Sequence, residues 1–121
     1  MDPEIERIIN KRIDQLQGLI EKGLKSDDLE TSIGYLDEAM ALAEEDGVSY
    51  TIAAIWGMKA CKFMDAGAPP IIAINCLKRG ILIDPTYDVN YEILGRIYLD
   101  LDEPEIAMRY FNQGKLLSNK Y

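Results

Sequence analysis

Residues 88–119 read DVNYEILGRIYLDLDEPEIAMRYFNQGKLLSN, and this stretch decides the fold of the chain. Apolar side chains recur in it every three or four residues, which is the spacing of amphipathic helices. We expect one helix that is capped by Asp88, and a second that is capped by Asp102 with Glu105 and ends near Asn119. The acidic residues between the two helices predict a turn, so the stretch reads as a helical hairpin.

The same stretch repeats the sequence that precedes it. A shift of 34 residues places small residues on small ones and large apolar residues on large ones. The pairs are Ala60 with Leu94, Cys61 with Gly95, Met64 with Tyr98, Pro70 with Pro104, Ala73 with Ala107, Ile74 with Met108, Leu77 with Phe111 and Gly80 with Gly114. A shift of 41 residues relates a weaker first copy to the middle one, with Leu36 on Leu77. Such repetition is typical of stacked supersecondary units.

The rest of the chain also predicts helices. Apolar residues keep the helical spacing, and no segment alternates for long enough with the period of two that a strand requires. Asp27 with Glu30 resembles a capping pair at one helix start. The fold class is therefore all-α, with about six helices in one domain. The expected helices before residue 88 are about 3–24, 28–46, 49–66 and 70–84, and the three hairpins are 1–47, 48–87 and 88–121.

The last copy resembles the tetratricopeptide repeat (TPR) in residue type and spacing. The residues that carry the resemblance are Tyr91, Leu94, Gly95, Tyr98, Ala107 and Phe111, with Pro85 where the family often closes the preceding repeat. Small residues such as Gly95 let the helices of a hairpin approach closely, and large ones such as Phe111 fill the gap. The resemblance weakens over residues 54–87 and further before residue 47. Gly57 departs from it, because the family tends to have a large aromatic residue there.

The resemblance implies a right-handed stack of three antiparallel hairpins, whose first helices line a concave groove for a peptide or a helix of a partner. Carried over position by position, the implied groove residues are Ile55, Met58, Lys59, Lys62 and Asp65, followed by Val89, Glu92, Ile93, Arg96 and Leu99. Neighbouring helix axes lie about 10 Å apart, so we expect Lys62 and Arg96 to reach one ligand. The expected partner is an apolar segment with acidic flanks or a free carboxylate.

The composition narrows the class of function. Hydrophobic residues make up 48% of the 121 residues and charged ones 28%, as in an ordinary globular domain. The chain has no histidine, which excludes histidine-dependent nucleophiles and histidine-ligated metals. A net charge of −8 argues against nucleic acid as a partner.

The sequence also indicates where the protein resides. Its uncharged stretches are too short to cross a bilayer, and its start lacks the features of a signal peptide. We expect no membrane insertion and a cytoplasmic protein with two free thiols, Cys61 buried and Cys76 half exposed.

No pattern indicates an enzyme or a cofactor. A calcium loop beginning at Asp100 would need glycine at Glu105 and glutamate at Phe111, and it has neither. No carboxylate stands in an apolar stretch that would raise its pKa into a catalytic range, and no glycine-rich phosphate loop is present. We therefore expect no catalytic residue, no cofactor and no metal.

The last helix indicates a second kind of contact. It carries apolar residues around much of its circumference, and repeat stacks normally close with a polar helix. The expected self-association residues are Met108, Leu116, Leu117 and Tyr121, with a homodimer as the simplest product. The leading hypothesis is an adaptor or chaperone-like protein that binds another protein. The alternatives are a structural subunit or self-associating scaffold that uses the last helix and, behind them, a small helical enzyme.

Overall fold

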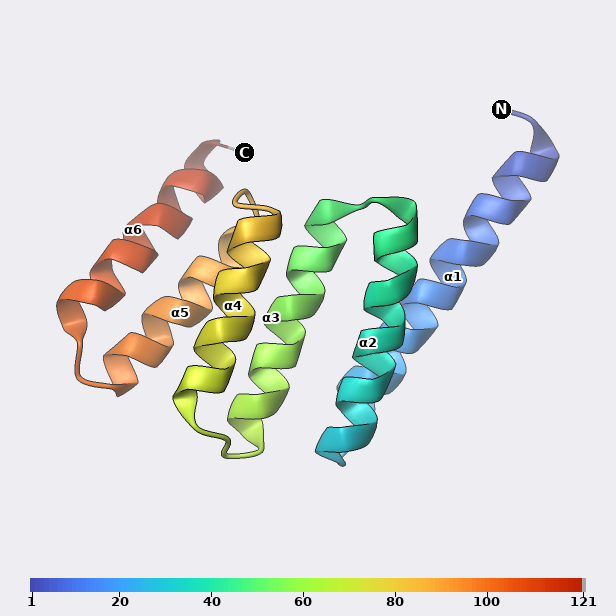
Figure 1. Ribbon diagram of the computed structural model, residues 1–121. Coiled ribbons are helices and arrows are strands. Elements are labelled where there is room, and N and C mark those ends of the chain that lie inside the picture. Colours follow the sequence, from blue (N-terminus) through green and yellow to red (C-terminus); the bar gives the residue numbers. More distant parts are fainter. Residues whose placement is uncertain (121) are drawn as a thin grey trace.

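The computed structural model describes the backbone of residues 1–120 and the side chains of residues 1–119, and within that range it contains six α-helices and no strand. The helices form a row that begins with α1 and ends with α6 (Figure 1). They are α1 (Pro3–Lys25), α2 (Leu29–Asp46), α3 (Ser49–Asp65), α4 (Pro70–Ile83), α5 (Asp88–Asp100) and α6 (Pro104–Lys120). The all-α prediction is confirmed, and the expected helix boundaries agree to within about two residues.

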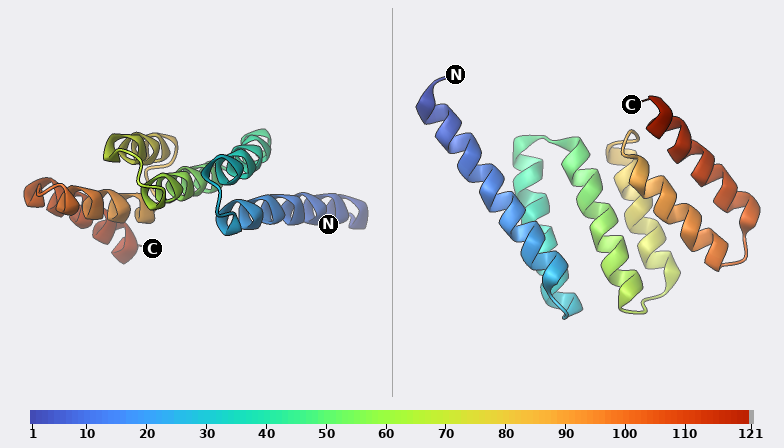
Figure 2. Two further views of the ribbon diagram at one scale, coloured as in Figure 1. Left: turned by 90° about the horizontal axis from the view of Figure 1, so that it is seen from below. Right: turned by 180° about the vertical axis from the view of Figure 1, so that it is seen from behind.

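Each helix packs against the next one along the chain, and α3 also contacts α1 and α5. The closest packing joins α1 with α2, α3 with α4 and α5 with α6, so the sequence repeat corresponds to pairs of helices. Figure 2 shows from behind that the two chain ends lie at opposite ends of the row.

Two clusters of buried apolar side chains hold the row together. The first, between α2 and α3, includes Leu36 and Ile55, both fully buried. The second joins α3, α4 and α5 and includes Leu77 and Leu94, also fully buried. Trp56 packs against both clusters and connects them. Burying one such side chain stabilises the fold by about 1.5–3 kcal/mol, so these clusters supply the main driving force.

Glycines let paired helices approach closely. A Cβ atom on Gly95 of α5 would lie 2.5 Å from the ring of Phe111 on α6, and one on Gly23 of α1 would lie 2.9 Å from Leu36 on α2. Both distances are far below van der Waals contact, so each glycine makes room for a large side chain of the second helix. The expected close packing of Phe111 over Gly95 is confirmed.

Asn90 of α5 occupies the junction of α3, α4 and α5. Its side chain is fully buried, and its Nδ2 donates a hydrogen bond of 3.0 Å to the carbonyl oxygen of Ala53. Gly57 and Gly80 flank it, since a Cβ atom on either would collide with the amide. The departure of Gly57 from the repeat pattern therefore has a local cause: an aromatic residue would displace Asn90.

The helix caps differ from the sequence expectation by one or two residues. The side chain of Asp28, not Asp27, accepts the backbone N–H of Thr31 at the start of α2. Asp88 is the first residue of α5 rather than its cap, and its carboxylate accepts a hydrogen bond from Ser118 instead. Asp102 lies before α6 in a left-handed conformation with φ 60°, where it ends α5. Its N–H donates to the carbonyl oxygen of Leu99. Asp102 therefore closes the C-terminus of α5 and does not cap the start of α6.

The loop between α4 and α5 is fastened to the start of α3. The carboxylate of Asp84 accepts hydrogen bonds from the hydroxyl and the backbone N–H of Thr86, and from Ser49 Oγ at 3.0 Å. Donation by the Thr86 hydroxyl, more than any other contact, lowers the pKa of Asp84. Tyr91 adds a bond of 2.9 Å from its hydroxyl to the carbonyl of Pro85.

We predict that Gly95→Ala destabilises the fold by about 1–3 kcal/mol, because the new methyl group collides with the Phe111 ring. Gly34→Ala is the matched control, since no atom lies within 4 Å of a Cβ at that helical position. The control should gain about 0.5–1 kcal/mol from the loss of glycine flexibility. Urea unfolding measures both changes, and equal stabilities of the two variants would contradict the packing described.

We predict that Asp84→Ala destabilises the protein by about 1 kcal/mol near neutral pH, because it removes three accepted hydrogen bonds. The folded-state pKa of Asp84 is below its ordinary value, so protonation favours the unfolded chain. The difference between wild type and variant should therefore persist above about pH 4 and shrink as the pH falls further. Thr86→Val, which removes the largest cause of the shift, should weaken that pH dependence, as urea titrations across the acidic range would show.

Candidate functional site

The predicted groove lies on α3 and α5, which contact each other directly. Of its apolar residues, Val89 is 38% and Leu99 49% exposed, while Met58 and Ile93 are half-buried. Arg96 is exposed and pairs at 2.7 Å with Glu92, one turn away on the same helix. The α5 side chains form what we call the α5 strip: Val89, Ile93, Arg96 and Leu99. Met58 of α3 packs against the α2–α3 core instead.

Ile55 does not belong to this groove, and its prediction was wrong. The side chain is 0% exposed and packs among the α2–α3 core residues. Each residue of an α-helix is rotated by about 100° from the one before it, so a small error in the assumed register turns a groove position into a core position.

Lys59 was also wrongly placed in the groove. Its side chain is only 12% exposed, and its Nζ forms an ion pair of 2.7 Å with Asp37 on α2. The ammonium group also lies 4.4 Å from the centroid of the Trp56 ring. The guanidinium carbon of Arg79 on α4 lies 5.4 Å from the same centroid. Lys59 therefore stabilises the packing of α2, α3 and α4.

Lys62 also makes contacts within the protein, which link α3 to the end of α1. Its Nζ donates hydrogen bonds of 2.8 Å to the carbonyl of Leu24 and 3.1 Å to that of Ser26, at the end of α1. Carbonyl groups at a helix C-terminus lack partners within the helix and carry partial negative charge, so a lysine is favoured there. Asp65 lies exposed near it, on the rim of a hollow between the α1–α2 turn and α3. Lys62 is therefore held at the end of α1, and no contact among the described residues brings it together with Arg96.

The two cysteines have the reverse of their expected exposure. Cys61 is half-buried and Cys76 is buried, and both are free thiols. Burial raises the pKa of each thiol above its ordinary value. Neither is therefore activated as a thiolate near neutral pH.

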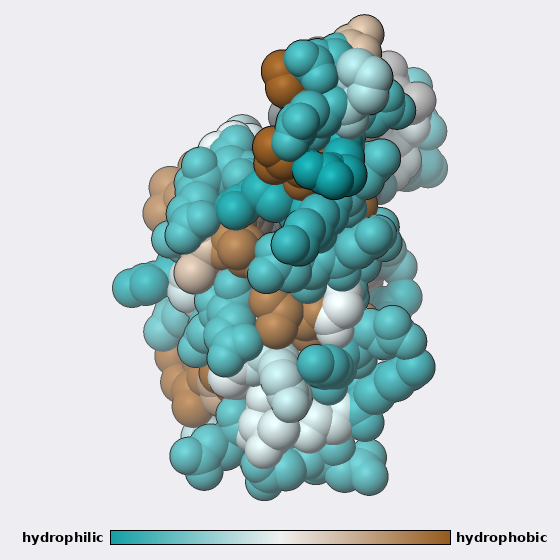
Figure 3. Space-filling model, turned by 90° about the vertical axis from the view of Figure 1, so that its right-hand side faces the viewer, coloured by the Kyte–Doolittle hydropathy of each residue, from teal (hydrophilic) through white to brown (hydrophobic). Residues whose placement is uncertain are grey.

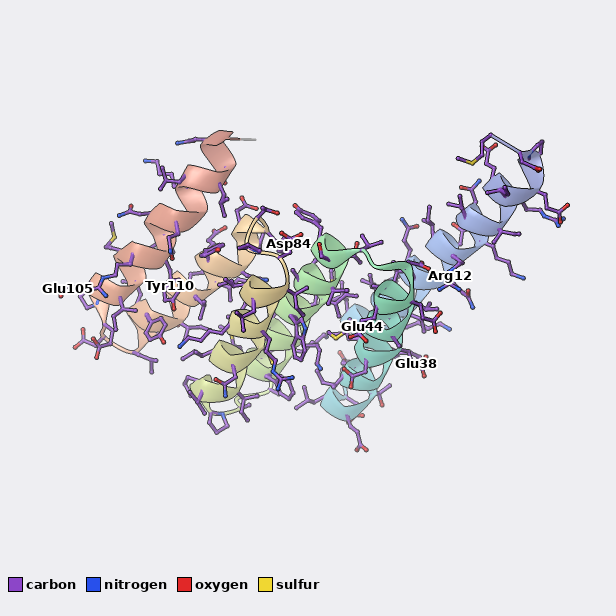
Figure 4. All side chains as sticks on the ribbon, turned by 45° about the horizontal axis from the view of Figure 1, so that its top comes forward. Arg12, Glu38, Glu44, Asp84, Glu105 and Tyr110 are labelled. Atoms are coloured by element: carbon purple, nitrogen blue, oxygen red, sulfur yellow. The ribbon has the colours of Figure 1, made fainter. Side chains whose placement is uncertain are left out.

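A second surface, which the sequence did not reveal, lies between α4 and α6. We call it the α4–α6 groove, a hollow of about 530 Å³. Its lining residues are Lys78, Ile81, Leu82, Tyr91, Ile106, Arg109, Tyr110 and Gln113. Within the described part of the chain, Lys78 and Arg109 form no ion pair. Figure 4 shows Tyr110 on the inner side of α6, where its ring stacks on Tyr98.

One sequence signal could have pointed to this groove. Leu77 aligns with Leu36, so Lys78 occupies the position of Asp37 in the first hairpin. In the first case the negative charge of Asp37 is neutralised by Lys59, whose ammonium group lies over the Trp56 ring. The replacement of an acidic by a basic residue at this position distinguishes the second hairpin from the first.

Two of the expected self-association residues of α6 are exposed in the structure. Met108 is 53% and Leu116 71% exposed, and the polar Asn112 lies between them along the helix. Leu117 is half-buried and lines a hollow of about 570 Å³ together with Tyr50. Tyr121 lies outside the described residues.

The first turns of α1 project beyond the rest of the protein. Arg12 forms ion pairs of 3.0 Å with Glu45 and with Asp46 at the end of α2, so α1 before Arg12 extends past its partner (Figures 1 and 4). These contacts raise the pKa of the Arg12 guanidinium, mainly through the hydrogen bond to Asp46. Every residue from 1 to 11 is exposed. We call residues 3–11 the α1 overhang.

The α1 overhang carries an apolar stripe. Ile5, Ile8 and Ile9 are 52%, 53% and 42% exposed, and their spacing places them on one face of the helix. That face continues the one with which Leu16 and Ile20 pack against the α2–α3 core. Figure 3, viewed from the α1 side, shows apolar surface on the segment that projects at the top. Exposed apolar residues that adjoin one another mark interaction sites more often than isolated ones do.

Comparison with protein-family models, curated proteins and solved structures found no match for this chain. Among the described residues, no three histidine, cysteine or acidic side chains are placed to hold a metal ion. None of the described helices combines the length and the apolar character that crossing a bilayer requires. The fold and its surfaces define an all-α protein built from paired helices.

We predict that Lys62→Met destabilises the protein by about 1–2 kcal/mol, because it removes two charge-assisted hydrogen bonds to the end of α1 while keeping the apolar stem. Hydrogen exchange should show the loss of protection at the α1–α2 turn first. Lys78→Met, at an exposed lysine, is the control and should change stability by less than about 0.5 kcal/mol. Equal effects of the two substitutions would show that Lys62 is a solvated side chain.

Proposed function

We propose that the protein is a cytoplasmic protein–protein interaction module, an adaptor or chaperone-like protein that catalyses no reaction. In this proposal the three helix pairs form a right-handed TPR-like stack, and the α5 strip lies in its concave face. The repeated pattern of contacts supports this arrangement, since α3 packs on α1 and on α5 as successive first helices of such a stack would.

The observation that carries the proposal is the α5 strip itself. Val89 and Leu99 expose apolar surface at the two ends of α5, with half-buried Ile93 one turn from Val89 and Arg96 between Val89 and Leu99. About ten residues at 1.5 Å per residue give a strip of roughly 15 Å, enough for several residues of an extended peptide or two turns of a helix. Buried apolar anchors of this kind usually supply most of the affinity of an interface.

Charge has a smaller role in this site than the sequence indicated. Lys59 and Lys62 are committed to contacts inside the protein, which leaves Arg96 as the cation beside the strip. Its ion pair with Glu92 is exposed and therefore weak, so a carboxylate of the partner can replace Glu92. The preferred ligand is an apolar segment with one acidic flank or a free carboxylate.

We predict that peptides selected by the wild-type protein from a random phage-displayed library lose about tenfold or more in affinity to a Val89→Asp, Leu99→Asp variant, because two apolar anchors become charged. Arg96→Glu should reduce the affinity only severalfold and make it less sensitive to salt. Leu82→Asp, at an 83% exposed position of α4 outside the strip, is the matched control and should bind normally. Circular dichroism would verify the fold of each variant, and equal affinity of the strip variant and the control would refute this binding site.

A further inference from the structure

Two surfaces at opposite ends of the row lack a partner, and their chemistry is complementary. The α1 overhang presents Ile5, Ile8 and Ile9 as a narrow apolar stripe. The α4–α6 groove presents an apolar floor with one cation on each wall, Lys78 on α4 and Arg109 on α6. We propose that the α1 overhang of one molecule docks in the α4–α6 groove of a second copy, so that the protein associates head to tail.

The apolar parts of the two surfaces agree in residue spacing and in length. An amphipathic helix that binds in a groove inserts residues at positions i, i+3 and i+4, which is the spacing of Ile5, Ile8 and Ile9. The groove offers half-buried Ile81, Ile106 and Tyr110 as its floor, and Leu82, which is 83% exposed, at its rim. The nine residues of the overhang form a rod of about 14 Å, shorter than the roughly 21 Å of α4, so the overhang fits along the groove.

The carboxylates of the overhang complement the groove cations, with Glu6 on one side of the stripe and Glu4 on the other, where Lys11 follows it two turns later. Glu4 and Glu6 lie about 100° to either side of Ile5 around the helix, so one carboxylate flanks each side of the stripe. Docking would place one flank toward Lys78 and the other toward Arg109. Glu4 pairs with Arg7 at 3.1 Å, but both side chains are at least 70% exposed, so this weak pair is readily exchanged. Neither Glu6 nor the two groove cations form an ion pair within the described residues.

The geometry requires a second molecule. The overhang and the groove lie at opposite ends of the row, so the overhang of a molecule does not reach the groove of the same molecule (Figure 1). A contact between two different surfaces is heterologous, and it leaves one free overhang and one free groove on every dimer. Association should therefore grow with concentration beyond the dimer. The binding of a partner to the α5 strip uses another face, so the two proposals stand or fall independently.

Paired variants provide the test. Ile5→Asp with Ile9→Asp disables the overhang, and Lys78→Glu with Arg109→Glu disables the groove. All four positions are exposed, so the folded monomer should tolerate the changes. Lys22→Glu with Lys115→Glu alters the net charge as the groove variant does, but at exposed lysines outside both surfaces, and it should associate like the wild type. Light scattering and sedimentation would report the mass over a wide range of concentration.

We expect the wild type to associate and each disabled variant to remain monomeric. An equimolar mixture of the two should then double its mass and go no further, because the mixture contains one intact overhang for each intact groove. A second variant carries Glu4→Lys and Glu6→Lys in the same chain as the two groove substitutions. It should associate again, because the charges of the overhang and of the groove are exchanged. A monomeric wild type at every concentration would overturn the proposal. So would a groove variant that still associates, or a mixture that remains monomeric.

Discussion

The buried amide of Asn90 is the contact on which the arrangement of the central helices depends. It lies where α3, α4 and α5 meet, and its hydrogen bond to the Ala53 carbonyl fixes the position of α5 along α3. The amide fits only because Gly57 and Gly80 have no side chains. Its Oδ1 accepts no hydrogen bond among the described residues, and losing the Nδ2 bond as well would cost about 1–3 kcal/mol, so sliding of the helices is disfavoured. The α5 strip and the α4–α6 groove both include residues of α5, so their positions depend on how this junction places α5.

The basic residues show how an acidic protein distributes a small number of cations. Lys59 lies between Asp37 and the Trp56 ring, and Lys62 donates hydrogen bonds to the carbonyl groups at the end of α1. Arg12 forms an ion pair with Asp46 at the acidic end of α2. Lys62 and Arg12 offset negative charge that gathers at helix C-termini and acidic last turns, and Lys59 offsets the carboxylate of Asp37 in the middle of α2. Lys78 and Arg109 perform no such task within the described residues. Cations in a chain of net charge −8 that stabilise nothing internally are well suited to binding.

The two ends of the row differ in how they meet solvent. On α6 the exposed Met108 and Leu116 are separated along the helix by polar residues such as Asn112. The start of α1 has the opposite character, since Ile5, Ile8 and Ile9 continue the stripe that packs against α2 after α2 has ended. The length difference between the paired helices, 23 residues against 18, creates this exposed segment. A mismatch in helix length therefore leaves part of a core-facing stripe exposed.

The sequence by itself determined the helices, their ends and their pairing, because apolar spacing, turn residues and a repeat are local patterns. It also indicated the close packing at Gly95, since a small residue aligned with small ones marks helix contact. Only the tertiary structure decided the site. Ile55 is buried and Lys59 largely buried, rather than exposed in a groove, because their burial depends on the rotation of α3 about its axis. Lys62 donates a hydrogen bond to the end of α1, at a residue 36 positions away in the sequence. The α4–α6 groove and the α1 overhang arise where helices of different pairs adjoin or end, and no local pattern records which surfaces a chain leaves uncovered.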